Sequence, residues 1–390
     1  MPTLRRLLVV STEDSTKLSS WSNVPYLFCK TLEDEGLEIK RLTLAPLGFW
    51  GGAVRWILRL LKLLRVGNES TWSYSRSAHY FKRAQRQIDQ ALQRETFDGV
   101  LILSFSYGPS LPSKIPLYLF GDWTLSYAIG CQRSRKPDRL EQASIGRESR
   151  LISAASAVFV LFPLAEKYIK NALPQSRTYY LGNVINAVRR PDEGDIKLKR
   201  DSFSLLFVGK EHYLAGALLL IEAYRVLKRK FPALVLNIVG MGKESLGNLP
   251  DGVFSHGYLD KGDTAQCAEY YALLRGARVF VNPNPRWASF SAALEAMYFY
   301  TPLVTSAYAE MEETFGRDIS FGYYYKSDAE QPLHELIEKL MLDENYESKA
   351  HNAHVEAGRF SWREYVGHVL NIIDKDELHE KIKQSSQLHL

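Results

Sequence analysis

Glu295 is the residue whose type and neighbours most directly suggest chemistry. It lies in the apolar, helix-like segment "SAALEAMYFY", which follows the polar loop "NPNPRWAS". An ionised carboxylate accepts paired hydrogen bonds, so it can hold the two hydroxyls of a ribose. Ser289 and Ser291 can cap this helix, and its free amide groups, from about Phe290, can hold a phosphate. A carboxylate on a solvated helix face is the alternative, and the spacing alone leaves both interpretations open.

A second candidate is the glycine pair Gly240 and Gly242 in "LNIVGMGKES", directly after a buried apolar run. Glycines at the end of a strand let the backbone turn tightly and let a phosphate approach the amide groups. The Gly-x-Gly spacing is weak evidence by itself, because many such pairs are only turns. It therefore supports a nucleotide site without establishing one.

The segment "VRWILRLLKLLRV" could bind a membrane surface. In a helix, Arg55, Arg59 and Lys62 share one side, and Trp56 belongs to the opposite, apolar side. Residues 39–68 include no acidic residue, as an interfacial helix at anionic headgroups requires. The alternative is a helix that packs on the domain core and exposes its arginines to solvent.

The composition limits the number of domains and the kind of partner. At 390 residues the chain exceeds what one hydrophobic core usually supports, which favours two domains. A net charge of +5 suits nucleotide phosphates or a membrane surface and falls short of a nucleic-acid-binding protein. Three widely separated cysteines indicate buried thiols in a reducing compartment. No apolar run could span a bilayer, and the first one is too short for a signal peptide.

Sequence motifs for metal, hydrolase and P-loop chemistry are absent. The nine histidines form no HExxH pattern and no cluster with cysteine. The nucleophile motif GxSxG and the P-loop motif do not occur either. We therefore expect no metal ion and no cofactor.

Strand-like and helix-like segments alternate in both halves of the chain. Apolar runs typical of buried parallel strands occur at 7–12, 37–44, 98–106, 115–122, 156–162, 203–209, 233–240, 278–283 and 302–306. Two α/β domains with parallel sheets are expected, at residues 1–188 and 203–360, joined by a charged linker at 189–202. Because ligands bind outside the carboxyl ends of such strands, a ligand cleft is expected between the domains.

The order of these pieces resembles glycosyltransferase family 4, the retaining, sugar-nucleotide-dependent enzymes of the GT-B type. "LLFVGKEHYLAGALLLIEAY", "LNIVGMGKE", "FSHGYLDK" and "LLRGARVFVNP" follow in the family's order, and "ALEAMYFYTPLVTS" resembles its donor-site helix. "GRFSWREYVGHVLNII" resembles its C-terminal helices. The resemblance implies two Rossmann-like, doubly wound domains, with a C-terminal helix within 361–390 that crosses back to the N-terminal domain.

The resemblance also implies that Glu295 binds the donor ribose, and it makes three departures visible, one of which is Gly121 where the family often has a histidine before the aspartate. The family has another glutamate eight positions earlier, where this chain has Trp287. The family's cationic pair, which neutralises the leaving diphosphate, is replaced by Leu214 and Ala215. The nucleoside end of the site is thus kept, whereas the sugar-phosphate end is altered.

Three residues are expected to carry the reaction. Lys210 and Arg286 are expected to stabilise the departing phosphate, which is the largest catalytic contribution in typical sites, and Asp122 is a possible sugar or acceptor contact. Besides Glu295, the expected donor-binding residues are Gly209, His212, Gly240, Gly242, Ser289, Phe290 and Ser291. The acceptor is expected in the N-terminal domain near Trp21, Ser22 and Asn23.

We therefore expect a cytoplasmic, metal-independent, retaining glycosyltransferase. It would move a hexose-type sugar from a nucleotide donor to a carbohydrate or lipid-linked glycan in polysaccharide biosynthesis. If segment 54–66 binds lipid, the enzyme would also contact the inner face of the membrane peripherally. A catalytically degenerate binding protein and a sugar-nucleotide epimerase of the same fold are the alternatives. The base, the sugar, the linkage, the acceptor and the oligomeric state stay open.

Overall fold

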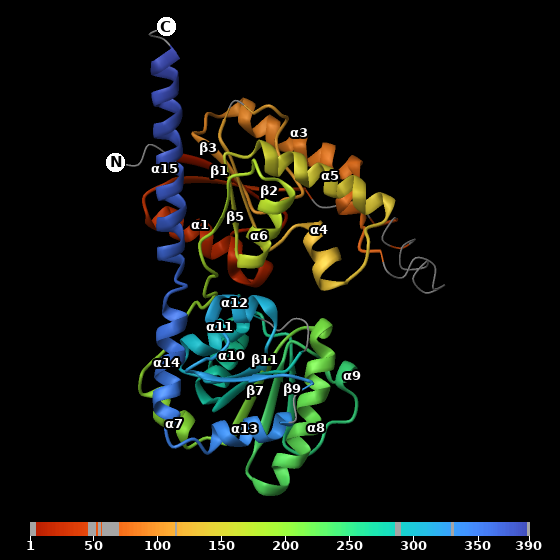
Figure 1. The fold of residues 1–390 in the computed structure, drawn as a ribbon, viewed down its shortest axis with the longest axis vertical. Coiled ribbons are helices and arrows are strands. Elements are labelled where there is room, and N and C mark those ends of the chain that lie inside the picture. Colours follow the sequence, from red (N-terminus) through yellow and green to blue (C-terminus); the bar gives the residue numbers. More distant parts are fainter. Residues whose placement is uncertain are drawn as a thin grey trace. The chain divides into compact units, whose positions relative to one another are not determined.

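The computed structural model describes residues 5–45, 52–53, 56, 70–113, 115–284, 290–328 and 331–387, excepting the side chains of residues 20, 132 and 376–387. The chain divides into two compact units. Unit 1 comprises the residues up to Gly182 together with those from Trp362 onward, and unit 2 comprises Asn183–Ser361. Each unit contains a parallel six-stranded sheet covered by helices (Figure 1), so the predicted α/β class is confirmed.

The sheet of unit 1 has the strand order β2-β1-β3-β4-β5-β6. Its strands are β1 (Arg6–Ser11), β2 (Glu38–Thr43), β3 (Gly99–Ile102), β4 (Leu117–Gly121), β5 (Ala157–Val160) and β6 (Thr178–Tyr180). Its helices are η1 (Ser20–Asn23), α1 (Val24–Asp34), η2 (Tyr74–Arg76), α3 (Ala78–Arg94), α4 (Leu125–Tyr127), η3 (Ala128–Gln132), α5 (Arg139–Ala154), α6 (Pro163–Ala172) and α15 (Trp362–Gln387). The inner strands are buried along their length because helices cover both faces of the sheet, as their apolar runs predicted.

Aromatic side chains hold α15 against the rest of unit 1. The Phe28 ring on α1 lies 4.9 Å from the Phe120 ring on β4 and 5.3 Å from the Trp362 ring, measured between centroids. Tyr365 packs edge-on against Phe120 at 5.9 Å. Clustered rings bury large areas and favour such tilted and edge-on geometries. The C-terminal helix therefore completes the core of unit 1.

The sheet of unit 2 has the order β12-β11-β10-β7-β8-β9. Its strands are β7 (Ser204–Val208), β8 (Val235–Val239), β9 (Val253–Gly257), β10 (Val279–Asn282), β11 (Leu303–Ser306) and β12 (Gly322–Tyr325). Its helices are α7 (Asp195–Arg200), η4 (Glu211–Tyr213), α8 (Leu214–Lys230), α9 (Lys243–Leu246), α10 (Thr264–Gly276), α11 (Phe290–Tyr298), α12 (Ala309–Phe315), α13 (Leu333–Met341) and α14 (Tyr346–Gly358). Helix α13 shows the usual helical periodicity, since its buried residues are Leu333, Leu336, Ile337, Leu340 and Met341.

The structure corrects the linker predicted at residues 189–202. Residues 195–200 form α7, and both Asp195 and Lys199 are buried within unit 2. The Lys199 Nζ donates hydrogen bonds to the Leu274 carbonyl, at 2.5 Å, and to the Ala277 carbonyl, at 3.2 Å. The charged composition that indicated a solvated linker thus reflects buried polar contacts to the end of α10, and the boundary between the units lies at Gly182.

In both sheets the strand order reverses next to the first strand of the unit. In unit 2 the chain proceeds from β7 to β8 and β9, and β10 then lies on the other side of β7. In unit 1 the corresponding neighbours are β1 and β3. Ligands of open α/β sheets bind at the carboxyl ends of the strands at such switch points. The loops after β7, β10, β1 and β3 are therefore the places to look for a site.

Candidate active site

Close backbone approaches shape the carboxyl edge of the sheet in unit 2. Gly240 has a φ of 101°, and a Cβ on it would lie 2.5 Å from the Gly209 carbonyl oxygen. A Cβ on Gly216, in the first turn of α8, would lie 3.0 Å from the Asn284 amide nitrogen. Only glycine lets these loops approach so closely. Gly209 and Gly240, two of the predicted donor residues, thus lie together, and Gly242 lies at the N-terminus of α9.

Two predicted basic residues follow β7 at this edge. Lys210 is exposed and makes no ion pair with any described residue, and its Nζ lies 5.3 Å from the centre of the Tyr258 ring. His212 is also exposed and packs on the Tyr213 ring, with 4.0 Å between centroids. Burial and the charge of Lys210 lower the pKa of His212, which keeps its imidazole neutral near pH 7. The positive charge here therefore comes from Lys210. Arg286 and Ser289 lie outside the described residues.

Glu295 is buried in unit 2 and holds four hydrogen bonds. Lys261 Nζ lies 2.7 Å from each carboxylate oxygen. The Tyr270 hydroxyl donates to Oε2 at 2.8 Å, and the Tyr271 hydroxyl donates to Oε1 at 2.9 Å. Each oxygen thus accepts two bonds, which fills the usual acceptor capacity of a carboxylate. In this conformation a ribose could bind Glu295 only if one of these donors moved away.

Burial of both rings, together with the charge of Glu295, raises the pKa of Tyr270 and of Tyr271 well above that of free tyrosine. Both hydroxyls therefore stay protonated and act as donors at any physiological pH. The Lys261 ammonium also lies 4.4 Å from the centre of the Tyr270 ring. This cation–π contact adds to the ion pair.

The same group of residues anchors the chain where unit 2 begins. The Tyr271 hydroxyl accepts a hydrogen bond from the Val188 amide at 2.8 Å. The Asn186 side-chain amide donates to the Ser291 hydroxyl at 2.9 Å. Ser291 lies in the first turn of α11 and Phe290 begins that helix, where it is buried. Ser291, one of the predicted donor residues, is thus positioned by its contact with Asn186.

In unit 1 the structure brings Asp122 and Trp21 together, although they are far apart in the sequence. Asp122 follows β4 and accepts a hydrogen bond from the Trp21 side chain. Burial raises the pKa of Asp122 to about 7, and the bond from Trp21 partly opposes this shift. Asp122 therefore titrates near neutral pH, as a group that exchanges a proton during a reaction would.

Backbone strain marks the same place. Trp21, Ser22 and Asn23 have φ values of 36°, 53° and 72°, so three consecutive residues other than glycine are left-handed. Each such residue costs about 1–2 kcal/mol, and strain of this kind clusters at functional sites. Trp21 also packs on Phe120 with 5.8 Å between ring centroids. The three residues predicted to contact the acceptor thus form one strained turn beside Asp122.

The predicted membrane-surface residues lie almost entirely outside the described part of the chain. Arg55, Arg59 and Lys62 are not described, whereas Trp56 is, and 66% of its surface is exposed. Among the described helices none is both long and apolar enough to cross a bilayer. The described residues also contain no group of three or more potential metal ligands.

Sequence reasoning missed the partners of Glu295, namely Lys261, Tyr270 and Tyr271. Lys261 follows β9, so it is located at the carboxyl edge of the sheet like the other site residues. The adjacent tyrosines have the spacing of ordinary core residues in α10. The position of Lys261 was therefore a signal that could have been used, whereas the tyrosines gave none.

Comparisons with known proteins agree with this fold. Residues 189–360 match the family model described as Glycosyl transferases group 1. No curated protein matches the sequence. A sucrose-phosphate synthase from Thermosynechococcus elongatus superimposes with a TM-score of 0.67 at 14% identity, covering 98% of this chain and 100% of that chain.

Two further solved structures share the fold. A glycosyltransferase from Rickettsia africae has a TM-score of 0.62 at 11% identity, over 96% of this chain and 99% of its own. HepE of Anabaena, in complex with UDP and glucose, has a TM-score of 0.57 at 14% identity, over 94% of this chain and 99% of its own. At such identities these likenesses concern the fold, and the family match concerns residues 189–360. Together they show two Rossmann-like units of the GT-B fold and a glycosyltransferase whose residues 189–360 match the group 1 family model.

Proposed function

We propose that this enzyme transfers a sugar from a nucleoside diphosphate sugar held by unit 2 to a carbohydrate or lipid-linked glycan held by unit 1. The observation that carries the proposal is the carboxyl edge of unit 2. There Gly209, Gly216 and Gly240 allow close backbone approach, and Lys210 has no carboxylate partner among the described residues. An uncompensated cation at the carboxyl ends of parallel strands suits a diphosphate. HepE, which has the same fold, is found with UDP, so uridine nucleotides are the first donors to test.

Lys210 has the proposed catalytic role of stabilising the departing phosphate, together with Arg286. Preorganised charges of this kind contribute about 3–4 kcal/mol per donor group. Because the charge on the leaving group can be met by side chains and amide groups, we propose a metal-independent reaction. We further propose that it retains the anomeric configuration, which the configuration of the product measured by NMR would test.

For Glu295 we propose a contact with the donor ribose that forms when Lys261 moves away. Lys261 lies in a loop and retains some exposure of its side chain, 14%, whereas both tyrosines are buried residues of α10. Lys261 is therefore the donor that can leave at the least cost in packing. Its ammonium would then be close enough to interact with the nucleotide.

In unit 1 we propose that Asp122 contacts the acceptor hydroxyl and that Trp21, Ser22 and Asn23 bind the acceptor around it. The support is the strained turn at these residues and the neutral-range pKa of Asp122. An acceptor in a cell-surface polysaccharide or glycan pathway fits this proposal.

A thermal-shift panel of nucleotides and nucleotide sugars tests the donor site. We expect one nucleotide to raise Tm, with the effect reduced in Glu295→Ala and in Lys210→Met. Lys230→Met is the matched control, because Lys230 lies at the far end of α8 and pairs with Glu338. No shift with any nucleotide would favour the non-catalytic binding protein. Conversion of the donor to an isomer without any acceptor would favour the epimerase.

A further inference from the structure

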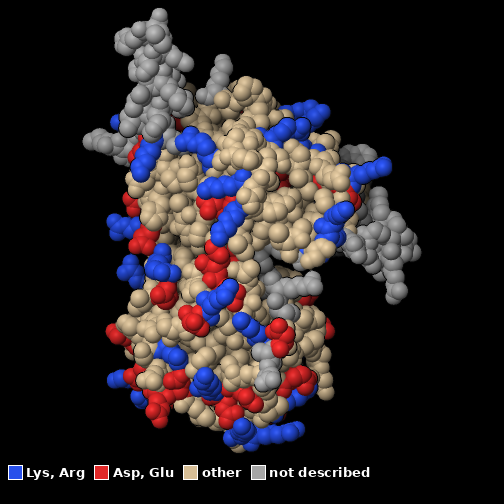
Figure 2. Space-filling model, in the orientation of Figure 1, with Lys and Arg blue, Asp and Glu red and all other residues tan. Residues whose placement is uncertain are grey.

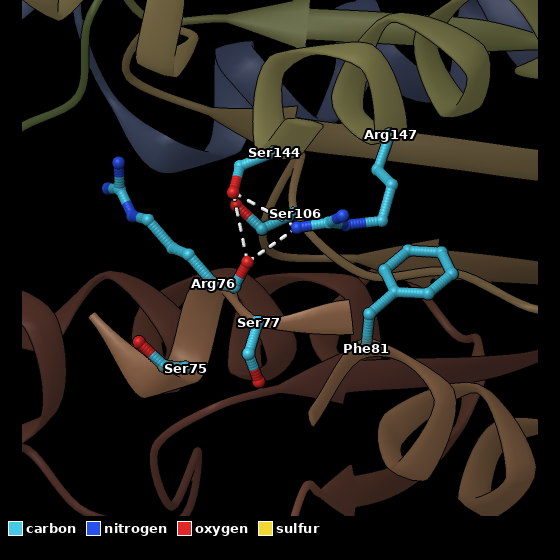
Figure 3. A pocket seen from close by; sticks show the side chains of 7 residues that line it. All are labelled: Ser75, Arg76, Ser77, Phe81, Ser106, Ser144 and Arg147. Atoms are coloured by element: carbon cyan, nitrogen blue, oxygen red, sulfur yellow. Dashed lines mark hydrogen bonds between the residues drawn. The ribbon is translucent and has the colours of Figure 1, made fainter. Parts of the chain in front are cut away.

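A small pocket in unit 1 is lined by residues that the donor reaction does not use. Four serines, Phe81, Arg76 and Arg147 surround it (Figure 3). Arg76 ends η2, and Arg147 lies on α5 with Ser144. Ser106 follows β3, next to the point where the strand order of unit 1 reverses. The pocket therefore lies at the carboxyl edge of this sheet, the same edge that carries Asp122 and Trp21.

The pocket holds positive charge that no carboxylate neutralises directly. Arg76 makes no side-chain hydrogen bond or ion pair with a described residue, and its Nη1 is buried without a partner. The Arg147 Nη2 donates to the Arg76 carbonyl at 2.5 Å and to the Ser144 hydroxyl at 3.0 Å. In the view of Figure 3 the two guanidinium groups lie on either side of Ser106 and Ser144. An unpaired buried donor costs free energy, so this arrangement is better suited to a bound anion than to an empty pocket.

Glu148 interacts electrostatically with both arginines, and its carboxylate already accepts other hydrogen bonds. It accepts hydrogen bonds from the Ser106 hydroxyl at 2.7 Å and from the Leu125 amide at 2.9 Å. Burial raises the pKa of Glu148, against the effect of both arginines. Burial and the charge of Arg150 in turn lower the pKa of Arg147. One carboxylate thus faces two arginines, and an anion between them would supply the missing negative charge.

The surface around the pocket is basic as well. Lys82 and Arg86 on α3 and Arg139 and Arg150 on α5 are exposed, and neither helix has an exposed acidic residue. Figure 2 shows basic side chains over this part of unit 1. A surface of one sign raises the local concentration of oppositely charged ligands. This surface would attract anions toward the pocket.

We propose that the pocket binds a phosphate monoester carried by the acceptor, between Arg76 and Arg147. This inference rests on the proposed function, since it takes unit 1 as the acceptor unit. The pocket is narrow, with room for about one water molecule as it stands. An oxyanion enters when Arg147 exchanges its bond to the Arg76 carbonyl for a charge-assisted bond to the ligand, which is the stronger of the two.

Binding of inorganic phosphate and of a hexose 6-phosphate to the full-length protein tests this site, with titration calorimetry at constant ionic strength and chloride as reference. Arg76→Gln should weaken binding by about 10-fold or more, the loss of one charged hydrogen bond. Arg225→Gln is the matched control, because it removes an exposed arginine on α8 of unit 2 that pairs with Glu222, and it should bind as the parent protein does. Vesicles with and without phosphatidic acid form a third arm, which distinguishes a lipid phosphate from a soluble one.

Arg76→Gln should also fold at least as stably as the parent without any anion, because its side chain leaves no partner behind. If Arg76→Gln weakens the binding of phosphate or hexose 6-phosphate, the result supports a sugar phosphate as the ligand. If it weakens only the binding to vesicles with phosphatidic acid, the result supports a lipid phosphate. Binding that Arg76→Gln and Arg225→Gln weaken equally, or not at all, would overturn the proposal. Nucleotide-induced stabilisation is measured separately, so a failure here leaves the donor site of unit 2 intact, and the converse also holds.

Discussion

The ion pair between Lys261 and Glu295 allows a quantitative test against a second pair with the same geometry. Lys261→Met removes a cation that lies 2.7 Å from a carboxylate with 3% side-chain exposure. Lys230→Met removes one that lies 2.7 Å from Glu338, but there the lysine side chain is 56% exposed. The two substitutions have the same chemistry and the same distance; the pairs differ in burial and in the contact of Lys261 with the Tyr270 ring.

Burial determines the expected magnitude. Removing one partner of a buried pair leaves an uncompensated charge and costs about 3–5 kcal/mol. Tyr270 and Tyr271 still donate to Glu295 after the substitution, so we expect the lower end of this range, about 3 kcal/mol. For Lys230→Met we expect less than about 1 kcal/mol, because water replaces an exposed partner.

Urea unfolding followed by circular dichroism measures both losses, and native-state hydrogen exchange assigns them to α10 and α11. The double variant Lys261→Met/Glu295→Gln should lose less than the sum of the single losses, by at least about 1 kcal/mol, since it removes both charges. The reasoning is refuted if Lys261→Met costs no more than Lys230→Met. It is equally refuted if the two single losses simply add.

Three further predictions follow from the same structure. Because burial raises the pKa of Asp122 to about 7, the transfer rate should fall as the pH is lowered from 8 to 6. In Asp122→Asn the rate should be low and should not change with pH over this range. If the variant keeps the pH profile of the parent enzyme, Asp122 takes no part in the reaction. Burial lowers the pKa of Lys199 to about 7, so between pH 7 and 10 the unfolded chain binds more protons than the folded protein does. The free energy of unfolding should therefore rise with pH by a few kcal/mol, about 1.4 per pKa unit. Lys199→Met should be less stable, because it leaves carbonyls unpaired, and urea titrations at each pH should show no such rise. Gly240→Ala should destabilise the fold by about 1–3 kcal/mol, because Gly240 has a φ of 101° and a Cβ there would lie 2.5 Å from the Gly209 carbonyl oxygen. Gly367→Ala, at an open position inside α15, should stabilise the fold by up to about 1 kcal/mol. Equal melting temperatures for the two variants would contradict this account.

Most inner strands could be predicted from the sequence because parallel strands buried on both faces read as continuous apolar runs. The strands that the sequence analysis did not identify are β6, β9 and β12, and each is an edge strand of its sheet. An edge strand is partly exposed, as in β12, where only Gly322 is fully buried. Its sequence therefore lacks the apolar run on which the prediction depends.

The prediction of a linker at residues 189–202 was wrong because the sequence does not show the partners of its charged residues. Charge and glycine content indicate a solvated linker when the partners are unknown. Asp195 pairs with Arg275, at 2.7 Å, and Lys199 caps the end of α10. Those partners lie about 80 residues further along the chain, so no local pattern could reveal that these charges are buried.

The sequence by itself determined the α/β class, the position of the glycine turns and the presence of a carboxylate on α11. Only the tertiary structure decided what that carboxylate contacts, and it assigned Lys261, Tyr270 and Tyr271 to Glu295. Likewise, only the tertiary structure showed that Asp122 contacts Trp21 and that Arg76 and Arg147 line one pocket. The physical reason is that sequence periodicity shows which residues of a helix or strand face the core and which face solvent. A site, in contrast, forms from residues that are far apart in the sequence and that the strand order brings to one edge of a sheet.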